Sequence, residues 1–153
     1  MLKLLSNMKS TLALMIVFVL ALAFAGCNKC EPKNELNGMV KKDAIVRVIK
    51  TTVSGPQFIS AANEYDTEIE VSFDEGVTYE PVDFSKYSVF ALPTTASCSS
   101  GYNRNVSAND AGQTVTYTVT ITECDYCEGT TTIPNWVLTT KVPASYTPIF
   151  EVN

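Results

Sequence analysis

The chain has 153 residues, with 11 Lys and Arg against 16 Asp and Glu, and contains no histidine. The absence of histidine excludes Ser/His/Asp triads, Cys/His dyads and His-ligated zinc, and the acidic balance argues against nucleic acid as a partner, because phosphate binding needs clustered Lys and Arg. We therefore expect a protein that is not an enzyme, with no catalytic residues, no metal and no cofactor, and the sequence does not indicate a small-molecule ligand. An enzyme would have to work with carboxylates alone, as glycosidases do.

Residues 1–26 have the pattern of a signal peptide. Lys3 and Lys9 give the first ten residues a positive charge, and "TLALMIVFVLALAFA" follows with fifteen uncharged residues. This run is shorter than the roughly 20 apolar residues that a membrane-spanning helix needs. We expect the segment to be removed during export, with a retained membrane anchor as the alternative and Met8 as a second candidate start.

Cys27 lies directly behind two small residues, Ala25 and Gly26. This pattern resembles the lipobox of bacterial lipoproteins, although Phe24 stands where Leu is usual. The resemblance implies a mature chain that begins at Cys27, carries acyl chains such as palmitate and is anchored to the membrane through them. Each buried methylene contributes about 0.8 kcal/mol to such anchoring.

The expected location of the mature chain is the bacterial outer membrane, facing either the periplasm or the cell surface. Asn28 is not the Asp that retains many lipoproteins in the inner membrane. All 16 acids but only 9 of the 11 bases follow Cys27, so the net charge of the mature chain is 9 − 16 = −7. Cys30 cannot be the lipidated residue, because Lys29 precedes it where a small residue is required.

After the lipid, the sequence predicts a polar tether over 27–43 and one folded domain over 44–153. Within the domain, apolar residues recur at every second position, which is typical of β-strands. Residues 69, 71 and 73 share one face of such a strand, whereas the apolar run 87–92 fits a strand buried on both faces. The other expected strands lie within 44–53, 114–122, 135–143 and 148–152.

This pattern predicts an all-β fold, a single antiparallel β-sandwich or open barrel of six to eight short strands, behind the signal peptide and tether. The stretch around "SANDAG" predicts a hairpin. Pairing residue i with residue 221 − i places Val106 opposite Val115 and Tyr102 opposite Val119, with all four on the apolar face. Cys98 then falls opposite Glu123.

The same register brings Cys98 close to Cys124 and Cys127. We expect a disulfide between Cys98 and Cys127, with Cys124 as the alternative partner, and in the first case Cys30 is left to pair with Cys124. A redox or zinc site is disfavoured, because the acids around "CDYC" would raise the thiol pKa.

Three other features have a structural and a functional interpretation. Eight acids between residues 64 and 83 fit a solvated strand face better than a calcium site. The threonines at every second position from 114 to 122 fit an exposed strand face, with an ice- or sugar-binding face as the alternative. Trp136 could form a sugar platform with Tyr102 and Tyr126, although a lone Trp is more often part of a core.

The segment 81–152 carries "VDFSK" before a strand, "GY" at the start of another and "KVP" near the last. In these motifs it resembles the C-terminal domain of PrcB, a lipoprotein subunit of a spirochaete surface protease complex, and small Bacteroidetes lipoproteins with similar domains. Ser99 and Ser100 replace the Thr or Gly expected before "GY", and Cys98 is an addition to the pattern.

The resemblance implies a noncatalytic envelope protein that acts as an interaction or accessory module and supports an exported protease. The alternative is a β-sandwich module that binds a carbohydrate or a surface through its aromatic or threonine face.

Overall fold

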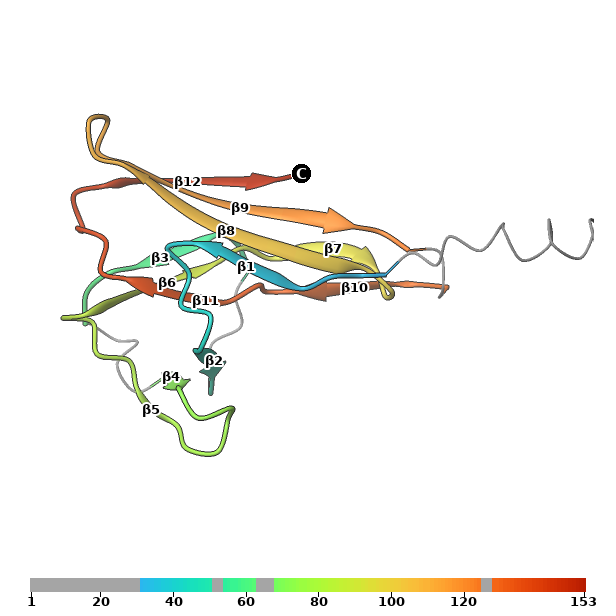
Figure 1. The fold of residues 1–153 in the computed structure, drawn as a ribbon, viewed down its shortest axis with the longest axis horizontal. Coiled ribbons are helices and arrows are strands. Elements are labelled where there is room, and N and C mark those ends of the chain that lie inside the picture. The colour runs from blue at the N-terminus through green and yellow to red at the C-terminus, as the bar shows by residue number, and fades with distance from the viewer. Residues whose placement is uncertain (1–30, 51–53, 63–67, 125–127) are drawn as a thin grey trace, which may run out of the picture. The chain divides into compact units, whose positions relative to one another are not determined.

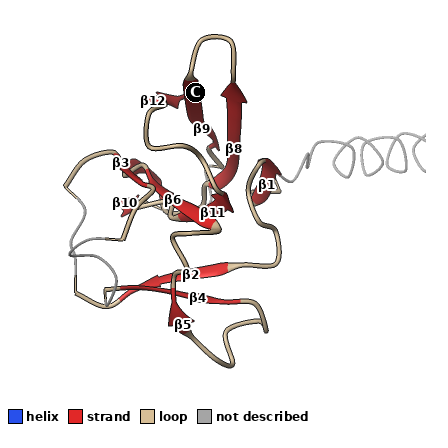
Figure 2. Cartoon of the chain, turned by 90° about the vertical axis from the view of Figure 1, so that its left-hand side faces the viewer, coloured by secondary structure: helices blue, strands red, loops and turns tan. Residues whose placement is uncertain are grey.

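The computed structural model describes residues 31–50, 54–62, 68–124 and 128–153 (Figure 1). The chain divides into two units, residues 1–30 and 31–153, and every described residue belongs to the second. The predicted signal peptide and Cys27 therefore lie outside the described residues. In the described ranges the secondary structure consists of strands, as Figure 2 shows, which confirms the all-β prediction. No helix that could span a membrane is found there.

The described residues form twelve strands in four sheets. The four-stranded sheet has the order β1-β8-β9-β12, the central sheet β11-β6-β3, the outer sheet β2-β4-β5, and a two-stranded ribbon pairs β10 with β7. The strand bounds, in chain order, are β1 Glu35–Gly38, β2 Ile45–Val48, β3 Gln57–Ile59, β4 Ile69–Ser72, β5 Glu80–Pro81, β6 Tyr87–Ala91, β7 Thr94–Ser97, β8 Gly101–Asn109, β9 Thr114–Thr122, β10 Thr130–Ile133, β11 Val137–Thr140 and β12 Thr147–Val152.

Strand β6 lies between two hydrophobic cores. Phe90 belongs to the first core, together with Tyr117 and other residues of the four-stranded sheet, whereas its neighbour Val89 belongs to the second core with Ile69 of the outer sheet. Because successive side chains of a strand point to opposite faces, one short apolar strand serves both cores. The prediction that 87–92 forms a strand buried on both faces agrees with the burial of β6.

The architecture differs from the expected single antiparallel sandwich in its strand count and in two strand pairs. β1 runs parallel to β8, and β12 runs parallel to β9, at the two edges of the four-stranded sheet. Parallel neighbours need long connections, and here each edge strand reaches the sheet from a distant part of the chain. Residues 35–43 also differ from a tether, since they contribute β1 and the buried Val40 to the first core.

The β8–β9 hairpin has the predicted faces but a different register. Val106 pairs with Tyr117 and Tyr102 with Ile121, so paired residue numbers add up to 223 and the expected 221 is wrong. Matching of apolar faces fixes only whether this sum is odd. The turn determines which odd sum the hairpin adopts. The amide of Gln113 donates to the carbonyl oxygen of Asp110 at 3.3 Å and closes a four-residue loop, which sets the sum to 223.

A polar network crosses the first core around Asn135, which has a φ of 46°. Its side-chain amide donates to Thr94 Oγ1 at 2.8 Å and to the Leu92 carbonyl oxygen at 3.1 Å, and its Oδ1 accepts from Arg104 Nε at 2.9 Å. Burial lowers the pKa of the Arg104 guanidinium. The network joins the segment between β10 and β11 to β7 and β8.

Candidate interaction surface

The structure has both Cys98 and Cys124 in disulfide bonds. Cys27, Cys30 and Cys127 lie outside the described residues, so the pairing of Cys98 with Cys127 or Cys124, and of Cys30 with Cys124, stays a prediction. Cys98 does not continue the β8–β9 hairpin as expected. It follows β7, and its amide donates to the Gly129 carbonyl oxygen at 3.2 Å, next to the ribbon.

The proposed sugar platform is not assembled by the described residues. Tyr102 is buried in the first core, and Trp136 is half-buried against the second core. Tyr126 lies outside the described residues. Since the two described rings pack in different cores, they cannot together present a flat aromatic surface.

The threonine row lies on the outer face of β9, away from the first core. Its neighbours across the strand pairs on β8 are uncharged polar residues: Thr116 pairs with Ser107, Thr118 with Asn105 and Thr120 with Asn103. On the other side, Thr118 Oγ1 donates to Glu151 Oε2 at 3.2 Å. This face carries an array of hydroxyl and amide groups.

Two of the described acids between residues 68 and 83 take part in local ion pairs. Glu70 forms an ion pair with Arg47, and Asp83 pairs with Lys86 at 2.8 Å. Among the described residues, no three His, Cys, Asp or Glu side chains are grouped so as to hold a metal ion.

An open surface depression of about 550 Å³ adjoins Lys141. The Lys141 ammonium donates to the Phe84 carbonyl oxygen at 2.6 Å and to the Ser60 carbonyl oxygen. These bonds tie the end of β11 to the segment after β3 and to the segment before β6, so this cation has a structural role.

Exposed apolar side chains gather on the outer sheet instead. Six large hydrophobic residues are exposed in the described part of the chain, and four of them belong to β2, to β4 or to the residues that follow these strands: Ile45, Ile49, Phe73 and Val77, with exposed fractions of 44%, 50%, 38% and 80%. We call Ile45, Arg47, Ile49, Val77 and Tyr79 the outer-sheet surface. Contiguous exposed apolar groups of this kind mark interaction sites more often than scattered ones do.

Strand pairing holds the residues of this surface next to one another. Ile45 pairs with Ser72 and Arg47 with Glu70, on the face of the outer sheet that points away from the second core. The Arg47 guanidinium lies over the Tyr79 ring, 3.8 Å from its centroid, and Arg47 Nε donates to Glu70 Oε2 at 3.0 Å. The positive charge in the middle of the surface is thus already compensated.

The loop between β4 and β5 holds Val77 in a fixed position. Asp74 accepts from the Thr78 amide at 2.9 Å and from the Ser72 hydroxyl at 2.6 Å, and these bonds, the Ser72 bond first, lower the pKa of Asp74 to about 2. Gly76 has a φ of 87°, and a Cβ there would lie 3.1 Å from the Tyr79 hydroxyl and 3.8 Å from Ile45 Cδ1. These contacts hold the backbone of the loop against the sheet, and the Val77 side chain points into solvent with an exposed fraction of 80%.

The surroundings of this surface are acidic. Residues 68–85 contain six acids and no Lys or Arg: Glu68, Glu70, Asp74, Glu75, Glu80 and Asp83. Two of these acids form ion pairs, Glu70 with Arg47 and Asp83 with Lys86. The surface combines apolar anchors with a negative rim.

Comparison with protein-family models, with curated proteins and with solved structures finds no match for this chain.

The sequence interpretation missed this surface as a candidate site. A signal was present, because 45–49 carries apolar residues on both faces of the strand while only one face can enter the core. Val77 lies in the polar stretch "FDEGVTYE", where a single apolar residue does not stand out.

Proposed function

We propose that the protein is a noncatalytic, lipid-anchored envelope protein that docks another protein through its outer-sheet surface. The proposal takes residues 1–26 as a removed signal peptide, Cys27 as the lipidated residue and the outer membrane as the location. The four-stranded and central sheets form the sandwich of the expected fold, and the outer sheet is added to it. The observation that carries the proposal is the group of exposed apolar side chains on the outer sheet, one of them on a well hydrogen-bonded loop.

The chemistry of this surface defines the partner. Apolar side chains surrounded by acids fit a partner segment that carries apolar residues flanked by Lys or Arg, because complementary charge steers and orients association. A fixed loop loses little conformational freedom on binding, which favours affinity. The resemblance to the PrcB domain suggests an exported protease as the partner.

Affinity isolation of the tagged lipoprotein from detergent-solubilised envelope tests the proposal. The wild-type chain should recover a stoichiometric protein, and Val77→Asp and Ile45→Asp should each reduce its recovery at least tenfold, about 1.4 kcal/mol. Ile149→Asp is the matched control, because Ile149 is also exposed, at 40%, but lies on β12.

The control should leave recovery unchanged, and higher salt should weaken recovery by the wild-type chain. Equal loss in Ile149→Asp, or no stoichiometric partner for the wild-type chain, would count against the proposal. Thermal unfolding of each variant separates a lost surface from a lost fold.

The lipid has its own test. Cys27→Ala should abolish labelling by a fatty-acid analogue and release the protein from membranes. A chain that is labelled equally well without Cys27 would refute the lipid assignment.

A second function, binding of a carbohydrate or another surface, is favoured by the hydroxyl and amide groups on the outer face of β8 and β9. Cosedimentation with insoluble polysaccharides tests it, with Thr120→Lys as the variant, because Thr120 is exposed on that face, near the end of β9. Binding that Thr120→Lys abolishes and Val77→Asp leaves intact would favour this second function over protein docking.

A further inference from the structure

Residues 31–34, which we call the strap, cross the beginning of β8 in direct backbone contact. A Cβ added to Gly101 would lie 2.5 Å from the Lys33 amide nitrogen and 2.7 Å from the Pro32 carbonyl carbon. The Tyr102 amide also donates to Asn34 Oδ1 at 3.2 Å. The absence of a side chain at residue 101 is what allows the strap to lie so close.

The strap is attached to the domain at its C-terminal side, because the chain enters the four-stranded sheet immediately after it. Glu35 pairs with Asn103 and Leu36 with Arg104, and Leu36 packs against the first core. The Met39 amide donates to the Val106 carbonyl oxygen at 2.8 Å, which continues the attachment.

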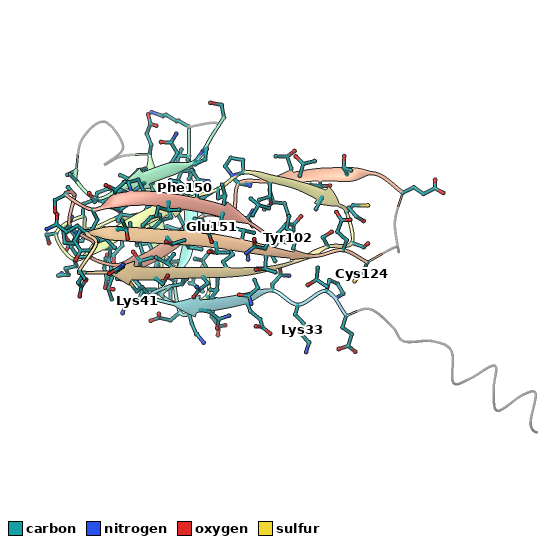
Figure 3. The ribbon with its side chains drawn as sticks, turned by 90° about the horizontal axis from the view of Figure 1, so that it is seen from above. Lys33, Lys41, Tyr102, Cys124, Phe150 and Glu151 are labelled. Carbon is teal, nitrogen blue, oxygen red and sulfur yellow. The ribbon has the colours of Figure 1, made fainter. Side chains whose placement is uncertain are left out.

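One end of the four-stranded sheet gathers the strap, the beginning of β8 and the end of β9. Figure 3 shows Lys33 and Cys124 toward this end and Lys41 toward the other. The β12 end lies there as well, since the Ile121 amide donates to the Asn153 carbonyl oxygen at 2.7 Å. We call this the strap end.

The outer-sheet surface lies away from the strap end. The outer sheet meets the central sheet near the start of β6, where the Phe73 and Tyr87 rings are 5.7 Å apart. β6 leads from there toward β7, and the Ser97 hydroxyl at the end of β7 donates to the Cys124 carbonyl oxygen at the strap end. Figure 1 shows β4 and β5 away from the point where β7 ends and β10 begins.

The distance between lipid and strap is limited by covalent geometry alone. Only three residues lie between Cys27 and Glu31, and the four steps from one Cα atom to the next span at most roughly 14 Å in an extended chain. We infer that the anchored domain stands with its strap end at the lipid surface and its outer-sheet surface directed away from the membrane. This inference rests on the proposed lipid at Cys27.

Charge does not offer an alternative reason for this orientation. Among the described residues near the strap end, the acids Glu31, Glu123 and Glu128 outnumber the base Lys33, and the undescribed connection to Cys27 adds only Lys29. Adsorption to anionic lipid headgroups needs clustered Lys or Arg. The short connection to the lipid therefore sets the orientation, and the docking surface stays accessible to a partner beyond the membrane.

Energy transfer from tryptophan to a lipid dye can measure this orientation, because the chain has a single Trp. The lipidated full-length protein is reconstituted into vesicles of phosphatidylethanolamine and phosphatidylglycerol that contain dansyl-phosphatidylethanolamine. In a Trp136→Phe background, Lys33→Trp reports on the strap end, Val77→Trp on the outer-sheet surface and Ala111→Trp on the hairpin tip. Transfer should be several-fold higher for Lys33→Trp than for the other two variants.

A flexible insertion of about 20 Gly and Ser residues between Asn28 and Lys29 provides the second arm, because such a linker has an end-to-end distance of about 25 Å. The inference predicts a clear fall in transfer from Lys33→Trp in the lengthened chain. Equal transfer from Val77→Trp and Lys33→Trp, or no effect of the insertion, in protein that is bound to vesicles would overturn the orientation and leave the lipid assignment standing. Failure of the wild-type chain to bind vesicles, or equal binding by Cys27→Ala, would refute the proposed lipid and this inference with it.

Discussion

The hydroxyl of Tyr117 donates a hydrogen bond of 2.6 Å to the backbone carbonyl oxygen of Asn135, inside the first core. Tyr117 is fully buried, and burial raises its pKa far above the usual value. This bond satisfies the carbonyl oxygen of a residue whose side chain links three other segments.

Tyr117→Phe should destabilise the domain by about 1–3 kcal/mol, because the substitution leaves the buried Asn135 carbonyl oxygen without its donor. Chemical denaturation measures the change. Tyr146→Phe is the control, since the Tyr146 hydroxyl donates to Asp110 at an exposed site, and it should change stability by less than about 0.5 kcal/mol. Equal effects of the two substitutions would contradict the structural role of the buried bond.

Asp74→Asn should reduce stability at neutral pH, because the amide nitrogen of Asn cannot accept the hydrogen bonds that both Asp74 oxygens accept. The pKa of Asp74 is lowered from 3.8 to about 2 in the folded protein, so its contribution is present above pH 3.8 and is lost as the pH falls to 2. The stability difference between wild type and variant should therefore shrink over this window. Unfolding measured from pH 5 to pH 2 checks this, with Glu75→Gln as the neighbouring exposed control.

Gly101→Ala should displace the strap, because the added Cβ would lie 2.5 Å from the Lys33 backbone. We expect a destabilisation of about 1–3 kcal/mol, the range found for overpacking, together with faster tryptic cleavage after Lys33. Gly55→Ala is a matched control, since a Cβ there meets nothing within 4 Å. A stable Gly101→Ala chain with unchanged cleavage would show that the strap is not held at this point.

Peptide mapping of the oxidised protein should recover Cys98 linked to Cys127, and Cys124 linked to Cys30. The loop closed by the first bond implies a stabilisation of roughly 3 to 4 kcal/mol in the entropic model, so reduction should lower the midpoint of unfolding. Recovery of a peptide in which Cys98 is linked to Cys124 would replace this connectivity by the alternative pairing. A free thiol at Cys98 or Cys124 would contradict the structure itself.

Strands whose own side chains enter a core were predictable from the sequence. Residues 69, 71, 87–91 and 114–122 show this, because burial of one or both faces imposes an apolar pattern on the strand itself. Strand β1 was not predicted, because its own residues do not show such an apolar pattern. Its sequence, "ELNG", contains one large apolar residue, and its place in the fold depends on pairing with β8 and on Val40 beyond its end.

The hairpin register and the candidate surface show two other limits. Face matching gives only the parity of a register, and the loop between Asp110 and Gln113 selects its value. The outer-sheet surface depends on which face of β2 the second core covers. That choice is made by strands distant in sequence, so periodicity within 45–49 could not reveal which isoleucines stay exposed.

The position of β6 between two cores has a consequence for folding. β6 pairs with β11, which comes much later in the chain. β1 likewise pairs with β8, which is synthesised long after β1. A ribosome or a translocon releases residues in order, so neither core can close until the last third of the chain has emerged. Domains dominated by such nonlocal pairs fold in milliseconds to seconds. During that interval the uncharged run "YSVFAL" is without its covering strands, and it is then a target for a chaperone that binds extended apolar segments.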